Sequence, residues 1–147
     1  MNIDKLRKEL ERDEGVKYEV YLDHLGYPTF GIGHLITDAD PECGASVGTK
    51  VDSDRVKEAF ETDVESVLSD CDRLYVQFEH LPEEVKLIVA NMMFNMGYTR
   101  LSKFKGMKYG VNTRDWNMAA DEMVDSNWYR QVTNRAERLV TRMRNIG

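Results

Sequence analysis

Residues 12–35 read RDEGVKYEVYLDHLGYPTFGIGHL, and this stretch decides the fold. It begins at the end of an amphipathic pattern over residues 2–13, whose apolar spacing predicts a helix. Gly15 suits the position just after a helix C-terminus. From residue 18 to residue 32, short runs of β-branched and aromatic residues predict strands, and the sequence His24-Leu25-Gly26 predicts the turn between two of them. We therefore expect a helix followed by a small antiparallel sheet.

The remainder of the chain is dominated by helical patterns. Residues 38–50 are rich in Pro, Gly and small side chains and predict a loop. An apolar stripe over residues 53–75 predicts a long helix with Asp52 as its N-cap. Residues 85–96 are apolar almost all round, which is typical of a buried helix, and Gly97 should end it. The fold class is therefore α+β and mostly helical. Shorter helices are expected around residues 104–107, over 113–124 and from 133 to the end.

Length and composition exclude several classes of protein. A chain of 147 residues suits one compact domain, and no apolar run approaches the roughly 20 residues of a membrane span. The N-terminus lacks a signal-peptide pattern, so we expect synthesis in the cytoplasm. Cys43 and Cys71 stand far apart and are expected to be free thiols. With three scattered histidines, no metal site is expected.

The charge is unevenly distributed along the chain. The net charge is −6, but residues 1–96 carry −11 and residues 97–147 carry +5. A basic C-terminal region could steer an anionic polymer toward the protein. Ordinary surface charge on helices explains the same excess equally well.

Two acids and a threonine in the opening stretch suggest chemistry on a sugar. Glu14 and Asp23 stand nine positions apart, and Thr29 follows six positions later. Hydrolysis of a glycosidic bond needs one protonated carboxyl group and one ionised carboxylate. Glu14, where the helix meets the sheet, is the candidate general acid, and Asp23, in a polar hairpin, is the candidate ionised partner. On spacing alone, solvated surface acids and a strand threonine are the more common explanation.

The same residues resemble the active-site segment of the T-even phage lysozymes, muramidases of glycoside hydrolase family 24. The similarity covers nearly the whole chain, and its motifs recur in the same order. They are Asp13-Glu14-Gly15, Tyr21, Asp23, Gly26-Tyr27, Thr29, Gly31-Ile32-Gly33-His34-Leu35, Phe60, Asp63-Val64, Asn91-Met92, Phe94, Met96-Gly97, Trp116, Ala119-Ala120, Trp128-Tyr129 and Asn134-Arg135-Ala136.

The resemblance implies a fold and an activity. The fold would be a single lysozyme domain over residues 1–147, with a small sheet lobe (15–52), a connecting helix (53–75) and a helical lobe (76–147 with the helix 2–13). The activity would be hydrolysis of the β-1,4 bond between N-acetylmuramic acid and N-acetylglucosamine in peptidoglycan. Inversion is expected, with carboxyl groups roughly 6.5–9.5 Å apart and a water oriented by Asp23 and Thr29.

The resemblance also implies what surrounds the reaction. No cofactor and no metal are needed, and the partner is bacterial peptidoglycan rather than nucleic acid or a membrane. The protein would act as a monomer and cause lysis of the host cell. It would stay in the host cytoplasm until a separate holin-like protein releases it to the wall.

Further site residues follow from the family pattern. Leu35 and Phe94 would contact the saccharide from opposite sides of the cleft, although core packing explains both equally well. His34 and Asp63 would form an ion pair between the sheet lobe and the connecting helix. Asn95 and Arg135 are also expected to lie in the cleft. At two further saccharide-contacting positions, Met107 and Glu122 replace the Ser and Asn of the family.

Three other functions fit parts of the pattern. A lytic transglycosylase or a chitin-type glycosidase could use the same fold, and a non-catalytic wall-binding module of a phage tail could keep the fold without the chemistry. A transglycosylase needs one acid only, so the presence of Asp23 argues against it. A binding module would have no need of Glu14.

Overall fold

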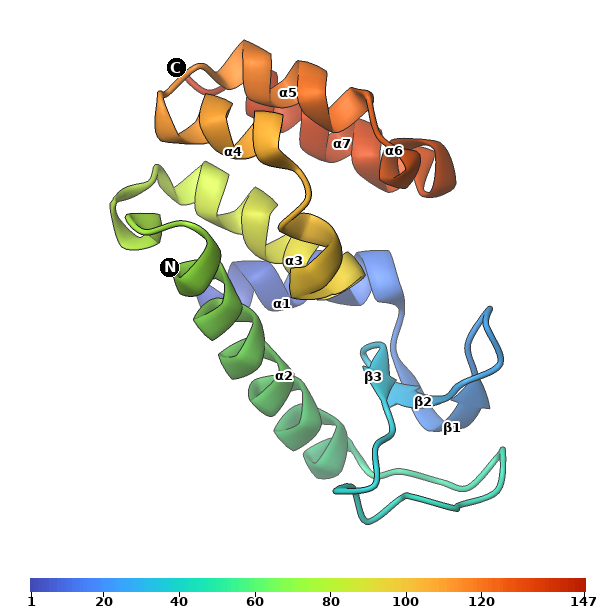
Figure 1. Cartoon of the computed structure of the whole chain (residues 1–147). Helices are drawn as coiled ribbons and strands as arrows, with labels where there is room; N and C mark the ends of the chain where they lie inside the picture. The colour runs from blue at the N-terminus through green and yellow to red at the C-terminus, as the bar shows by residue number, and fades with distance from the viewer. The chain divides into compact units, whose positions relative to one another are not determined.

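The computed structural model describes residues 1–147 and contains seven α-helices and one three-stranded antiparallel sheet (Figure 1). This confirms the expected α+β, mostly helical class. In chain order the elements are α1 (Ile3–Glu14), β1 (Lys17–Leu22), β2 (Pro28–Gly31), β3 (His34–Leu35), α2 (Ser53–Leu74), the 3-10 helix η1 (Phe78–His80), α3 (Glu83–Leu101), α4 (Lys105–Asn112), α5 (Trp116–Val124), α6 (Asn127–Gln131) and α7 (Thr133–Arg144).

The chain forms two compact units. The sheet unit is residues 7–66, and the helical unit is residues 1–6 together with 67–147. Both boundaries fall inside helices, because α1 and α2 each contribute residues to both units. The expected division into a sheet lobe, a connecting helix and a helical lobe stays a prediction.

The sheet has the order β1-β2-β3 and two distinct faces. Tyr21 pairs with Thr29, and Thr29 pairs with Leu35, so these three residues form one row across the sheet. Directly opposed residues of antiparallel strands point to the same face, and successive residues point to opposite faces. Phe30 and its partner His34 therefore lie on the other face, where the centroids of their two rings are 4.9 Å apart.

Local sequence signals set the ends of the first two long helices. The Asn2 side chain accepts a hydrogen bond from the backbone N–H of Lys5 at 3.1 Å, and Asp52 caps α2 by accepting from the N–H of Arg55 at 2.8 Å. Gly15 has a φ of 77° and donates to the carbonyl of Glu11, which ends α1. The expected N-caps Asn2 and Asp52 and the expected helix end at Gly15 are confirmed.

Helix α3 is the buried centre of the helical unit. Every residue from Val85 to Met93 is buried, as the apolar run predicts. Gly97 has φ 80° and ψ 168°, a conformation outside the helical region, so the long helix breaks there and a further turn continues to Leu101. The expected end at Gly97 is therefore a kink between two helical segments.

The C-terminal helices pack on one another and include one element that the sequence patterns missed. Helix α5 contacts both α4 and α7, and these helices lie together in the orange and red part of the chain (Figure 1). Helix α5 begins at Trp116 rather than at residue 113, because Asp115 caps it by accepting from the N–H of Met118. Helix α6 was not predicted, since five residues are too few for a periodic pattern to appear.

Two further features concern the environment of the chain. No helix has both the length and the apolar character that crossing a bilayer requires. Cys43 is exposed and Cys71 is buried in the apolar stripe of α2, and both are free thiols. Burial, with the nearby charges of Asp72 and Asp70, raises the pKa of the Cys71 thiol and keeps it protonated.

Two glycines in α4 give a test of how closely α4 packs on α5. A Cβ on Gly110 would lie 2.7 Å from the backbone nitrogen of Ala119, whereas a Cβ on Gly106 would meet only the side chain of Glu122. Gly110→Ala should lower the free energy of unfolding by about 1–3 kcal/mol because the backbones must separate. Gly106→Ala is the matched control, since the Glu122 side chain can move and alanine favours helix by about 1 kcal/mol. Equal stability of the two variants in denaturant titrations would contradict this packing.

Candidate active site

Glu14 is the last residue of α1, and its half-buried side chain lies against the turn between β2 and β3. A Cβ on Gly33 would stand only 2.9 Å from Oε1 of Glu14. Gly33 also has a φ of 60°, which other residues adopt with strain. The glycine therefore lets the carboxyl group approach the backbone closely, and the helix end and the sheet together place this side chain.

Asp23 organises the hairpin between β1 and β2 with one of its two carboxylate oxygens. Its Oδ1 accepts hydrogen bonds from the backbone N–H groups of Leu25 and Tyr27, both at 2.9 Å. The backbone closes the same turn, because the N–H of Asp23 donates to the carbonyl of Tyr27. The turn role and the proposed chemical role are therefore compatible: Oδ1 holds the hairpin, and Oδ2 is left for another donor.

Tyr21 links the two acids. Its phenol pKa is raised by partial burial and then by the negative charges of Glu14 and Asp23, so both carboxyl groups act on one ring. Lys17 covers that ring, with its Nζ 4.3 Å from the ring centroid. Opposite Tyr21, the buried Thr29 donates its hydroxyl proton to the carbonyl of Tyr27 at 2.9 Å and keeps its oxygen lone pairs as acceptors.

Leu35 ends the row that begins with Tyr21 and Thr29. It pairs with Thr29 on β3 and is 49% exposed, so it is not a core residue of the sheet unit. Its partner in the family pattern, Phe94, lies in α3 of the helical unit and is half buried. The saccharide-binding roles of both residues stay predictions.

His34 lies on the opposite face of the sheet and contacts two acids. Its Nδ1 is 2.7 Å from Oδ2 of Asp63 in α2, which is the expected partner. Its Nε2 is 2.9 Å from Oδ2 of Asp40, which the sequence analysis missed. Burial lowers the His34 pKa, but the hydrogen bonds and charges of the two carboxylates outweigh burial and raise it above its ordinary value.

Arg55 of α2 holds the loop that follows β3. Its guanidinium group contacts both carboxylate oxygens of Glu42, at 2.8 and 2.9 Å, and Oδ1 of Asp40 at 3.0 Å. It also pairs with the exposed Glu58 at 2.9 Å. Burial raises the pKa of Asp40, but the Thr37 backbone, His34 and Arg55 outweigh burial, so that pKa is lowered. The loop is thereby fastened to α2 by charge-assisted hydrogen bonds.

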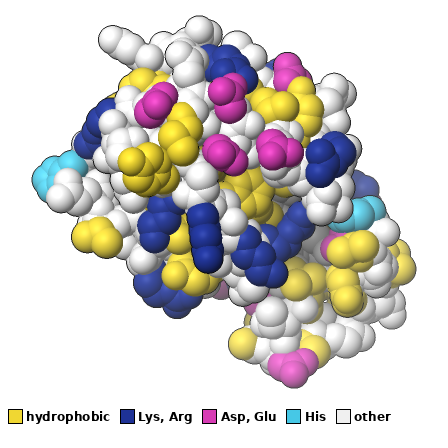
Figure 2. Space-filling view, turned by 45° about the horizontal axis from the view of Figure 1, so that its top comes forward, with side chains coloured by type: hydrophobic (Ala, Val, Ile, Leu, Met, Phe, Trp, Pro, Cys, Tyr) yellow, Lys and Arg dark blue, Asp and Glu magenta, His cyan; other side chains and the backbone are white.

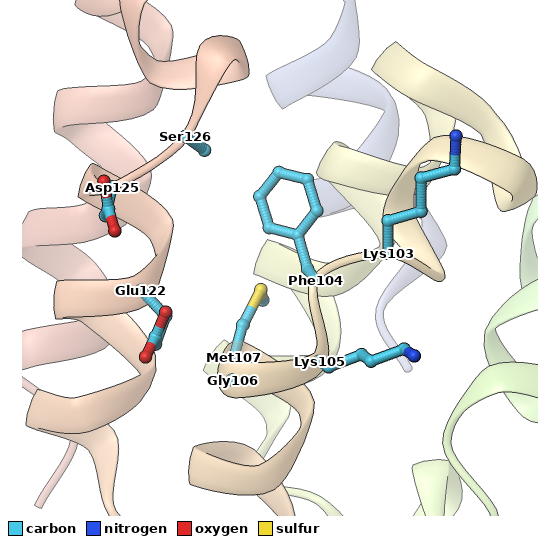
Figure 3. Close-up of a pocket in the computed structure, with 8 residues that line it drawn as sticks. All are labelled: Lys103, Phe104, Lys105, Gly106, Met107, Glu122, Asp125 and Ser126. Carbon is cyan, nitrogen blue, oxygen red and sulfur yellow. The ribbon is translucent and has the colours of Figure 1, made fainter.

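The helical unit contains a pocket of about 240 Å³ between the start of α4 and the end of α5 (Figure 3). Residues 103–107 line one side, and Glu122, Asp125 and Ser126 line the other. The family pattern named Met107 and Glu122 as saccharide-contacting positions, and both residues line this pocket. Figure 3 shows the apolar side chains of Phe104 and Met107 facing the two acids across the pocket.

Two residues expected in the cleft have hydrogen-bond partners within the helical unit. Arg135 is 8% exposed, and its Nε donates to Oδ1 of Asn91 at 2.9 Å, so it belongs to the interior of the helical unit. Asn95 accepts a hydrogen bond from the indole nitrogen of Trp128 at 2.7 Å. The expectation that both are cleft residues took no account of these partners, which lie far away in the sequence.

Basic and acidic side chains both lie on the face of the protein shown in Figure 2. Several Lys and Arg side chains lie side by side below a group of Asp and Glu side chains, and other Lys and Arg side chains lie among the acids. In the pocket, Glu122 and Asp125 stand on one wall, while the side chains of Lys103 and Lys105 extend away from it (Figure 3). Steering of an anionic polymer would therefore depend on the face that the protein presents.

The pair of His34 and Asp63 should stabilise the protein over a defined pH range. His34 has a raised pKa, so its contribution is complete below the unfolded value and is lost as pH rises through the folded value. Replacing either residue by Asn should cost about 2–3 kcal/mol in mildly acidic solution. Thermal unfolding of the two single variants and the double variant measures the coupling. Glu61→Gln, an exposed acid on α2, is the control, and an absence of coupling below the His34 titration would refute the pair.

Comparisons with known proteins identify the family of this chain. The sequence profile of the family described as "Phage lysozyme" matches residues 11–145. The chain is 32% identical, over 95% of its length, to "Probable T4-type lysozyme 1" of Dictyostelium discoideum, of which it covers 93%. The chain is 30% identical to the pre-baseplate central spike protein Gp5 of Enterobacteria phage T4 and covers 26% of that protein. It is 29% identical to the peptidoglycan hydrolase gp36 of Pseudomonas phage phiKMV and covers 15% of that protein. The chain therefore belongs to the phage lysozyme family.

Proposed function

We propose that this protein is a muramidase that cleaves the β-1,4 bond between N-acetylmuramic acid and N-acetylglucosamine in bacterial peptidoglycan and so lyses the host cell. As a member of the phage lysozyme family it is a cell-wall hydrolase of the glycosidase class. The observation that carries the finer proposal is the placement of both carboxyl groups in the sheet unit: Glu14 lies against the turn at Gly33, Asp23 is fixed in the hairpin, and the charges of both raise the pKa of Tyr21.

Glu14 is proposed to protonate the leaving glycosidic oxygen. General acid catalysis needs a carboxyl group that is held in place and reaches the oxygen through a hydrogen bond. Its position supports this role, because the end of α1 and the backbone at Gly33 restrict the movement of the side chain. A freely rotating surface glutamate would lose much of the advantage of orientation.

Asp23 is proposed to be the base that orients a water molecule on the opposite face of the sugar ring. Its Oδ1 is occupied by the hairpin, so Oδ2 would accept the proton of the water. The Thr29 hydroxyl, paired across the strands with Tyr21, would help to hold that water through its lone pairs. Attack by water on the opposite face inverts the anomeric configuration.

Glu14→Gln should abolish lysis and leave the fold intact, because the amide has nearly the same shape but cannot donate an acidic proton. The loss should be roughly 10²–10⁴-fold in the rate of turbidity decrease of purified sacculi. Glu11→Gln, one turn earlier on α1, is the control and should keep activity. Activity of a folded Glu14→Gln variant within threefold of wild type would remove Glu14 from the mechanism.

Asp23→Asn should be severely impaired, although its side-chain oxygen can still accept the hairpin hydrogen bonds. Asp23→Cys should retain some activity, since a water-orienting group can be partly replaced. NMR of the fresh products should show reducing muramic acid ends of inverted configuration. Retained configuration would exclude Asp23 as a water-orienting base, and 1,6-anhydro ends would show transglycosylation.

A second function is supported by one comparison. Because a relative of this chain is a phage central spike protein, the same fold also occurs within a virion component. In that setting the domain would open the wall locally rather than lyse the cell from inside. Detection of the protein in purified virions would favour this role, and its presence only in infected cells would favour the lytic one.

A further inference from the structure

The geometry around His34 requires a doubly protonated ring. Its Nδ1 lies 2.7 Å from a carboxylate oxygen of Asp63, and its Nε2 lies 2.9 Å from one of Asp40. Ionised carboxylates only accept hydrogen bonds, and a neutral imidazole has a single N–H. Both contacts are hydrogen bonds only when the ring carries both protons. Loss of one proton must therefore break one of the two contacts.

The contact with Asp40 is the one that should break. Asp63 makes its hydrogen bond with His34 alone, so a neutral ring keeps its N–H there. Asp40 has other donors, because its Oδ2 accepts from the N–H of Thr37 at 2.8 Å and its Oδ1 accepts from Arg55 at 3.0 Å. An acceptor that keeps other partners loses less free energy than one left without any.

His34 follows a turn that has little freedom to move. A Cβ on Gly31 would lie 3.1 Å from Val56 of α2, and a Cβ on Gly33 would lie 2.9 Å from Oε1 of Glu14. The chain between them is thus in close contact with α2 at one glycine and with the Glu14 carboxyl group at the next. A shift of His34 would be passed to the adjacent Gly33 and from there to Glu14.

We propose that Asp40, held by Arg55, is a positioning residue for Glu14, acting through the doubly protonated ring of His34 and the backbone of Gly33. This rests on the proposed function of Glu14. When His34 loses its second proton, the ring separates from Asp40, the turn loosens and Glu14 is held less firmly. The rate of the chemical step then falls, while the fold and the binding of substrate persist.

The charged groups around His34 set the direction of the pH effect. The loop contributes Asp40, and α2 contributes Asp63 and, one contact further away, Arg55; α1 contributes Glu14 beyond Gly33. Apart from Arg55 these groups are acids, and together they favour the imidazolium, in agreement with the raised His34 pKa. The positioning should therefore hold below the His34 titration and fail as pH rises through it.

The test compares Asp40→Asn with Asp38→Asn. Asp38 lies in the same loop, is exposed and contacts only the Cys43 thiol at 3.6 Å, so its variant has the same charge change without the contact to His34. Nitrogen NMR of the histidine ring gives the His34 titration directly, and kcat and KM on soluble peptidoglycan fragments are measured across pH 5 to 10. Ionisation of the general acid Glu14 also lowers kcat as pH rises, so the contribution of His34 is identified by comparing the rate profile of each variant with its own His34 titration.

In Asp40→Asn the midpoint of the His34 titration should move down by about one pH unit, and the alkaline fall of kcat should move down with it. At the wild-type midpoint this lowers kcat about fivefold, since roughly a tenth of the rings rather than a half remain doubly protonated. KM should not change, and Asp38→Asn should behave as wild type. A shifted titration without a shifted rate profile would overturn the positioning role. An inactive wild-type protein with the expected titration would overturn the proposed function and leave the double contact of His34 established.

Discussion

The turn at residues 31–34 is confined on both sides, and the sheet unit depends on this confinement. A Cβ on Gly31 would meet Val56 of α2, a Cβ on Gly33 would meet Glu14 of α1, and His34 contacts Asp63 and Asp40. A side chain at either glycine would push the strand away from its helix, so the close packing at both positions depends on glycine. Short strands such as β3, with only two residues, gain most of their order from such contacts and little from the sheet itself.

The confinement also explains how an acid-rich segment folds. In the sheet unit, two cations form ion pairs with four carboxylates. His34 pairs with Asp40 and Asp63. Arg55 pairs with Asp40, Glu42 and Glu58. Three of these carboxylates, all except the exposed Glu58, are partly withdrawn from water and need such partners. The cost of gathering these charges is offset by the short, charge-assisted hydrogen bonds that they form. A loop without regular secondary structure is thereby given a defined path along α2.

The candidate site combines residues of two kinds. Glu14 lies at a helix end and Asp23 in a hairpin turn. Both features have recognisable sequence signals, so the local structure around the two acids could be predicted. Asp40 and Arg55 were missed, because a loop acid and an exposed-looking helix arginine have no periodic signal that distinguishes them. Their partner His34 was identified, but its second contact depends on the path of the loop, which no local pattern describes.

The carboxyl pair of the proposed reaction was named from the resemblance and stays a prediction. The sequence by itself determined the class of fold, the helix caps, the hairpin and an interruption at Gly97. These depend on backbone preferences and side-chain spacing within a few residues, which the linear order contains. Only the tertiary structure decided that Asp40 shares His34 with Asp63, that Met107 and Glu122 line one pocket, and that Arg135 is buried against Asn91. Such contacts join residues far apart in the chain, and they exist only once the packing of whole elements has brought those residues together.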